Sequence, residues 1–139
     1  MRATDPQQSF KAVLLASLAY LIIGIVFAIL AKGASLAPMQ TAWRLVAWFT
    51  SASVFTIHIW YEHFRLRNLP FKASLHVSLA MALGAMTLAL AAYLQRLASS
   101  ENPSSLAWAI IAWPLFTALP GFLIAFVSTT VIDRIRRNP

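Results

Sequence analysis

The stretch "HIWYEH" at 58–63 holds the densest group of chemically capable side chains in this 139-residue chain. His58 and Glu62 stand four residues apart, so on a helix they are neighbours within hydrogen-bonding reach. A further histidine, His76, follows on the next apolar segment, at a similar distance from the loop that connects the two. We expect a hairpin between these segments to bring His58 and His76 together, with Glu62 close by.

Such a cluster suits several roles. A histidine paired with a glutamate can relay protons in a coupled transporter, because histidine titrates near neutral pH. Two histidines that face each other across helices can also ligate a haem or contribute to a metal site. In the plainest alternative, His58 and His76 join helices by hydrogen bonds while Glu62 and His63 lie in water. We expect no cofactor and no metal, and we keep haem ligation by His58 and His76 as an alternative.

The sequence contains few of the residue patterns that enzymes use for catalysis. It contains no cysteine, which excludes disulfides, thiolate metal sites and cysteine nucleophiles. No HExxH, GxSxG or phosphate-binding glycine loop occurs. The four acids lie near the chain ends or beside the apolar segments, at Asp5, Glu62, Glu101 and Asp133. We therefore predict that the protein is not an enzyme.

The composition indicates a membrane protein. Hydrophobic residues make up 60% of the chain and charged residues only 11%, against about 25% charged in soluble domains. Asp, Glu, Lys and Arg are missing from four long segments, 12–31, 45–61, 73–95 and 102–132. A membrane-spanning helix needs about 20 mainly apolar residues. We predict an all-α integral membrane protein with four transmembrane helices in a single membrane domain, residues 1–139.

The basic residues predict an orientation. Eight of the eleven fall in the N-terminal segment, the 62–72 loop and the C-terminal tail, and three fall between them at Lys32, Arg44 and Arg96. Cytoplasmic loops collect Lys and Arg, so both termini and the middle loop should be cytoplasmic, with the protein in the cell membrane. This distribution explains the net charge of +7 without a nucleic-acid partner.

The chain contains an internal repeat. "FKAVLLASLA" at 10–19 is echoed by "FKASLHVSLA" at 71–80, "AWRLVAW" at 42–48 by "AWAIIAW" at 107–113, and "RLRN" at 65–68 by "RIRRN" at 134–138. Repeats of this kind mark repeated structural units. We predict two tandem helical hairpins, at 10–68 and 71–138. Because both hairpins start from the same side, a pseudo-twofold axis along the membrane normal should relate them.

This layout resembles the small efflux proteins that are built from a "bacterial transmembrane pair" repeat, and Lys72 shortly before His76 is similar to part of their motif. That motif has a membrane-embedded glutamate about a turn and a half after the histidine. Here the position is Met81, and its counterpart in the first copy is Tyr20. The resemblance therefore implies an architecture and carries over no site residue.

Small and polar residues predict the packing faces. Gly24 and Ala28 form a small-residue pair in the first span, and Ala80 and Gly84 continue the face of His76 in the third. In the second span one face carries Ser51 together with Arg44, His58 and Glu62. We expect the polar face of the second span to meet the small-residue face of the third. Two residues are expected to kink the fourth span, Pro114 and Pro120.

These patterns favour a small non-catalytic membrane protein that acts through helix packing. Its expected partners are the lipid bilayer and other membrane-protein subunits or further copies of itself. The alternatives are a proton-coupled transporter of cations or small molecules and a haem-binding redox protein.

Overall fold

The computed structural model describes residues 6–99 and 104–137, and these residues form helices and short connections without any strand. The first hairpin consists of α1, Pro6–Gly33, and α2, Ala37–Trp60, which continues into a single π-helical turn, η1, Tyr61–Arg65. The second consists of α3, Pro70–Ala98, the one-turn α4, Ser104–Ala107, and α5, Ala109–Arg137. The predicted all-helical class is confirmed.

Three of the helices are long and apolar enough to cross a membrane: α1, α3 and the part of α5 that ends at Ile135. The remaining long helix, α2, has 24 residues, which is sufficient length, but none of its 18-residue stretches is as apolar as those of the other three. It includes Gln40 and Arg44 near its start and a series of hydroxyl side chains in its second half. Its composition explains why the structure supports three of the four predicted spans.

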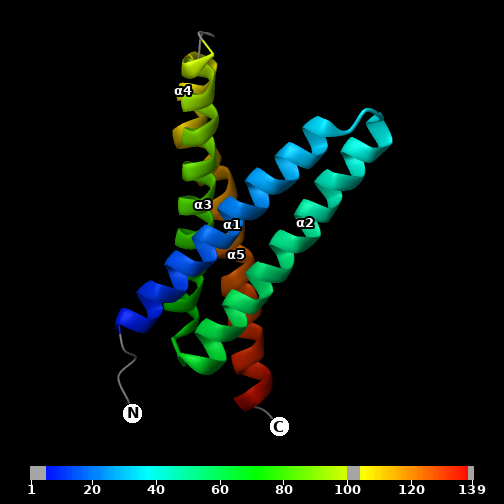
Figure 1. Ribbon diagram of the computed structural model, residues 1–139. Helices are drawn as coiled ribbons and strands as arrows, with labels where there is room; N and C mark the ends of the chain where they lie inside the picture. Colours follow the sequence, from blue (N-terminus) through cyan, green and yellow to red (C-terminus); the bar gives the residue numbers. More distant parts are fainter. Residues whose placement is uncertain (1–5, 100–103, 138–139) are drawn as a thin grey trace.

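The α3 helix holds the molecule together. It packs against α5 along its length and against α1, whereas α2 contacts mainly α1. In Figure 1, α3 and α5 stand side by side and the α1–α2 hairpin leans away from them. The start of α1, the η1 segment and the end of α5 lie at one end of the bundle, and the turn between α1 and α2 and the short α4 helix lie at the other (Figure 1).

Small residues let α1 and α3 approach closely. Ala80 is buried in a cluster with Val13 and Ala16 of α1. A Cβ placed on Gly84 would lie 2.7 Å from Tyr20 Cβ and 3.2 Å from the Ser17 carbonyl oxygen. Absence of a side chain at Gly84 is therefore what permits the crossing of the two helices, as small-residue interfaces in membrane proteins require.

The small-residue face of α3 does not meet α2, contrary to our expectation. Ala80 and Gly84 face α1, and Gly24 of α1 faces Leu88 of α3. Ser51 is only partly buried and Ala28 is exposed. The cause is the splay of the hairpins: α2 approaches α3 only at its C-terminal end, so the two predicted faces lie together only near His58 and His76.

A second cluster joins α2, α3 and α5 at that end. Ile59, Val77 and Ala125 are buried together, with Phe55 packed against them. The α5 helix is continuous through Pro114 and Pro120, and the residue after the second proline, Gly121, leaves room for the Met81 side chain. Kinks at the two prolines remain a prediction.

Candidate functional site

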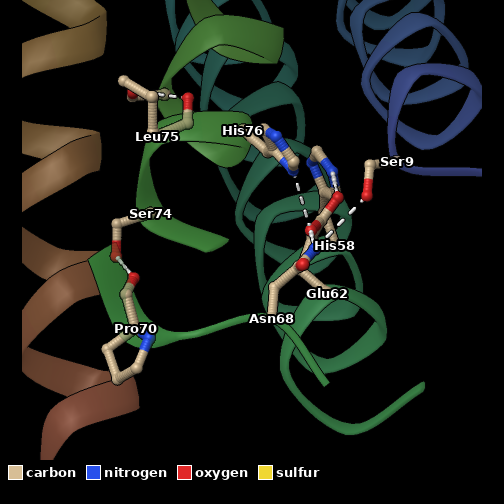
Figure 2. Close-up of polar contacts among 9 residues, drawn as sticks. Ser9, His58, Glu62, Asn68, Pro70, Ser74, Leu75 and His76 are labelled. Carbon is tan, nitrogen blue, oxygen red and sulfur yellow. Dashed lines mark hydrogen bonds and ion pairs between the residues drawn. The ribbon is translucent and has the colours of Figure 1, made fainter. Parts of the chain in front are cut away.

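A fully buried carboxylate occupies the centre of the candidate site. Glu62 lies in η1 and its side chain is 0% exposed. Its Oε2 atom is 3.0 Å from His76 Nδ1 and accepts a hydrogen bond from Asn68 Nδ2. Its Oε1 atom is 3.6 Å from Nε2 of His58, one turn earlier. Figure 2 shows the two imidazole rings and the amide converging on this one carboxylate.

Four segments bring these side chains together. His58 comes from the last turn of α2, Glu62 from η1, Asn68 from the connection to α3, and His76 from the second turn of α3. The start of α1 joins them, because Asn68 Nδ2 also lies 3.3 Å from Ser9 Oγ. The cluster therefore connects both hairpins at one end of the bundle.

The π turn and the strained connection after it set this geometry. Leu66 N–H donates to the Tyr61 carbonyl across the wide turn, and Asn68 N–H donates to the Glu62 carbonyl. Arg67 between them has a φ of 54°, a left-handed conformation that is uncommon for residues other than glycine. Single π turns occur often at functional sites. Here the turn directs Glu62, His63 and Asn68 into the protein.

The surroundings keep Glu62 ionised. Burial alone would raise its pKa, but the nearby His58 ring, the hydrogen bonds with His76 and Asn68, and the charge of His76 hold the pKa below its usual value. A buried carboxylate without such partners would become protonated instead. The site is thus a compensated buried charge rather than the water-exposed acid of the plainest sequence interpretation, which was wrong for both Glu62 and His63.

One contact in the cluster is incomplete. Neither ring nitrogen of His58 has a hydrogen-bond partner, and neither does Glu62 Oε1. Their 3.6 Å separation is an ion-pair distance but too long for a hydrogen bond. Chemically, the cluster can hold a proton or pass one between the carboxylate and either histidine.

A second polar group adjoins the first. His63 Nε2 lies 3.2 Å from Asp133 Oδ1, which links η1 to the last turns of α5. Beside this pair is a cavity of about 410 Å³ whose lining residues are His63, Phe64, Arg67, Asn68, Leu69 and Asp133. Ser9, Asn68 and Asp133 also belong to this end of the bundle and were not predicted from the sequence. The repeated "RLRN" and "RIRRN" segments were the available signal, since Asn68 and Asp133 lie in and beside them.

The arrangement does not fit a haem between His58 and His76. Both rings approach the same carboxylate, so a macrocycle placed between them would have to displace Glu62. Among residues 6–99 and 104–137, no group of three or more His, Cys, Asp or Glu side chains is arranged to hold a metal ion.

Ser51, the remaining member of the predicted polar face, lies two turns before His58 on α2 and outside the cluster. The structure therefore brings together His58, Glu62 and His76 and leaves Ser51 apart. No protein-family model, curated protein or solved structure matches this chain.

Proposed function

We propose that this chain is a non-catalytic, four-helix integral membrane protein of the cell membrane that acts by packing against a second copy of itself through α2. The observation that carries the proposal is a groove on the uncovered side of α2. It is shallow and open, has a volume of about 370 Å³, and is lined by Phe49, Ala52, Ser53, Thr56 and Ile57.

The groove suits a neighbouring membrane helix. Ala52, Ser53 and Thr56 are small, and the Ser53 and Thr56 hydroxyls donate to the carbonyls of Phe49 and Ala52 in their own helix. Their polar atoms are therefore satisfied, and a partner backbone can come close at little cost. The bulkier Phe49 and Ile57, which are 74% and 64% exposed, flank the small residues. On a twofold-related copy, the same two side chains would supply the complementary knobs.

The chemistry of α2 also calls for a protein neighbour. Unlike the other long helices, it has no 18-residue stretch apolar enough to mark a membrane span, and it contacts mainly α1. Phe49 projects from the side that carries the groove, and Ser53 and Thr56 are exposed on it. A helix with polar and basic side chains is stabilised in a bilayer when those faces turn toward protein or the interface. A symmetric α2–α2 contact would cover this side of the helix.

The course of the chain supports a fourth span and cytoplasmic termini. Both α1 and α3 begin at the same end of the bundle and run away from it (Figure 1). If both cross the membrane, α2 must return the chain through it before α3 can begin. That end carries the regions richest in Lys and Arg, which favours the cytoplasmic side. Two hairpins entering from one side also agree with the proposed pseudo-twofold axis along the membrane normal.

Cysteine crosslinking tests the packing proposal, because the natural chain has no cysteine. Ser53→Cys in the groove should give a disulfide-linked dimer when native membranes are oxidised. Leu18→Cys, on the exposed side of α1, is the matched control and should remain monomeric. Equal crosslinking of the two variants, or none by Ser53→Cys, would count against a symmetric α2 contact. Crosslinking of Ser53→Cys only to a different protein would replace the self-assembly with a subunit role.

A second candidate function is proton-coupled transport of a cation or small molecule. The observation that favours it is Glu62, an occluded carboxylate whose contact with His58 is incomplete. Proteoliposomes containing a trapped pH dye would be given a pH gradient and then Na⁺, K⁺ or tetraphenylphosphonium. A coupled transporter would dissipate the gradient with one of these cations, and Glu62→Gln would abolish the effect while Arg65→Ala would not. Rates equal to those of empty liposomes would argue against exchange of these cations.

A further inference from the structure

The cavity beside η1 has the properties of a binding site that neither proposed function uses. It lies at the end of the bundle where η1, the connection to α3 and the last turns of α5 meet. Its volume of about 410 Å³ is sufficient for a small polar group. Its lining combines an acid, Asp133, with a base, Arg67.

Two buried polar atoms on the inner side of this cavity have no hydrogen-bond partner. Asn68 uses its Nδ2 group on Glu62 and Ser9, which leaves its Oδ1 buried without a partner. His63 directs Nε2 toward the Asp133 carboxylate, and its Nδ1 is also buried and unpartnered. With the proton on Nε2, Nδ1 is an acceptor. The Asp133 carboxylate is 31% exposed and is open to a cationic group with several N–H donors. Such donors would also satisfy the two enclosed acceptors behind it once the His63 and Asn68 side chains turn toward the cavity.

Arg67 provides the opposite charge at the same cavity. Its side chain is exposed, and it forms no ion pair with any residue in the described part of the chain. Its left-handed backbone places a fixed, strained residue at the cavity edge, a feature that concentrates at functional positions. A ligand that fits both ends must therefore carry a primary ammonium and an anionic group a short distance away.

The position of the cavity identifies the class of molecule. Leu69, which lines it, is 76% exposed, and the neighbouring Trp60 and Phe71 are 56% and 62% exposed. Exposed tryptophan and other apolar side chains at the end of a membrane bundle mark the level of lipid headgroups. We propose that this cavity binds the headgroup of phosphatidylethanolamine, with the ammonium at Asp133, His63 and Asn68 and the phosphate at Arg67. The inference depends on the membrane-spanning helices and is independent of the proposed α2 contact.

Three lipids with the same acyl chains distinguish the need for N–H donors from the need for a positive charge. Phosphatidylcholine keeps the positive charge but has no N–H to donate, and phosphatidylglycerol keeps the phosphate but has no ammonium. The purified full-length protein would be exchanged into an equimolar mixture of these two lipids and phosphatidylethanolamine, and retained lipid would be counted by native mass spectrometry. We expect phosphatidylethanolamine to be enriched about tenfold over phosphatidylcholine, the difference expected for hydrogen bonds to a charged group.

Substitutions at the cavity test which residues bind the ammonium and which bind the phosphate of the headgroup. Asp133→Asn should remove the preference for phosphatidylethanolamine, and Asp133→Glu should retain most of it. Arg67→Ala should weaken retention of phosphatidylethanolamine and phosphatidylglycerol together. Arg65→Ala, on the same segment but outside the cavity, is the matched control and should change nothing. Thermal unfolding of each variant would verify that it is folded.

Competition with soluble phosphoethanolamine distinguishes a free zwitterion from a lipid. The lipid should remain bound at concentrations at which the soluble compound, lacking acyl chains, displaces little of it. Equal retention of all three lipids, an unchanged preference in Asp133→Asn, or complete displacement by phosphoethanolamine would overturn the proposal. Retention of none of the lipids would also overturn it and leave a cavity filled by water.

Discussion

His76 Nδ1 lies 3.0 Å from Glu62 Oε2, and this contact joins η1 to α3 where the two hairpins meet. Elsewhere α2 and α3 have little contact, because the α1–α2 hairpin leans away. The polar cluster therefore holds the two hairpins together at this junction, where the apolar contact between α2 and α3 is small. Ile59 and Val77 are buried in a cluster at the same end of the bundle. Substitution of Glu62 should therefore lower the free energy of unfolding of the whole protein.

Glu62→Gln should lower the free energy of unfolding by about 3 kcal/mol, the cost typical of breaking a buried charge pair. Glutamine keeps the size of the side chain but removes the negative charge. It also turns one acceptor into a donor that competes with the N–H groups of Asn68 and the histidines. Thermal or denaturant unfolding in one detergent would measure the loss. Arg65→Ala, exposed on the same π turn, should change stability by no more than about 0.5 kcal/mol.

Acid should destabilise the natural protein more than the Glu62→Gln variant. The pKa of Glu62 is lowered in the folded protein from an ordinary value of 4.5, so near this pH the unfolded chain binds more protons than the folded one. The contribution of Glu62 is complete above pH 4.5 and is lost as the pH falls through the folded pKa. Melting temperatures from pH 3 to 7 would test this.

The difference between the two pH curves isolates Glu62, because both proteins retain the groups that face it, His58, His76 and Asn68. Curves that stay parallel down to pH 3 would show that the ionised carboxylate does not stabilise the fold.

The sequence predicted the helical class and the proximity of His58, Glu62 and His76, because these depend on local spacing and on the short connection that precedes α3. Apolar segment lengths determine helices, and a spacing of four residues makes helical neighbours. It did not predict the burial of Glu62. That burial depends on the π turn and on Asn68, which reaches back to Glu62 from six residues later.

The partner of the Ala80–Gly84 face was also beyond sequence reasoning. A small-residue stripe indicates that some helix comes close but carries no information on which one. Here the crossing of α1 over α3 decides it, and that crossing results from the whole set of interhelical contacts.

Gly84→Ala should destabilise the protein, whereas Gly33→Ala should not. The new methyl group at position 84 would meet Tyr20 Cβ at 2.7 Å and the Ser17 carbonyl at 3.2 Å, and neither atom belongs to the flexible end of a side chain. Overpacking of this kind costs about 1–3 kcal/mol, more than alanine returns through helix propensity. At Gly33 a Cβ has no neighbour within 4 Å. Unfolding of both variants would be compared, and equal stabilities would contradict the close α1–α3 crossing.

Ala52→Leu should shift the natural protein from dimer to monomer, because the leucine fills the groove that is proposed to receive the partner. The side chain is exposed in the single chain, so folding should be little affected. Sedimentation in a density-matched detergent would measure the monomer fraction. Ala28→Leu places the same change on an exposed site of α1 and should leave the dimer intact. A loss of dimer in Ala28→Leu alone would move the contact from α2 to α1.

The last prediction concerns the direction of the chain across the membrane. Ser35, in the turn between α1 and α2, and Leu69, before α3, are both exposed and lie at opposite ends of α2. A membrane-impermeant maleimide should label Ser35→Cys in intact cells and Leu69→Cys only after the cells are permeabilised, because positively charged loops stay in the cytoplasm. Labelling of both sites from one side would mean that α2 does not cross. Since α1 and α3 run in the same direction, α1 and α3 would then not both span the bilayer.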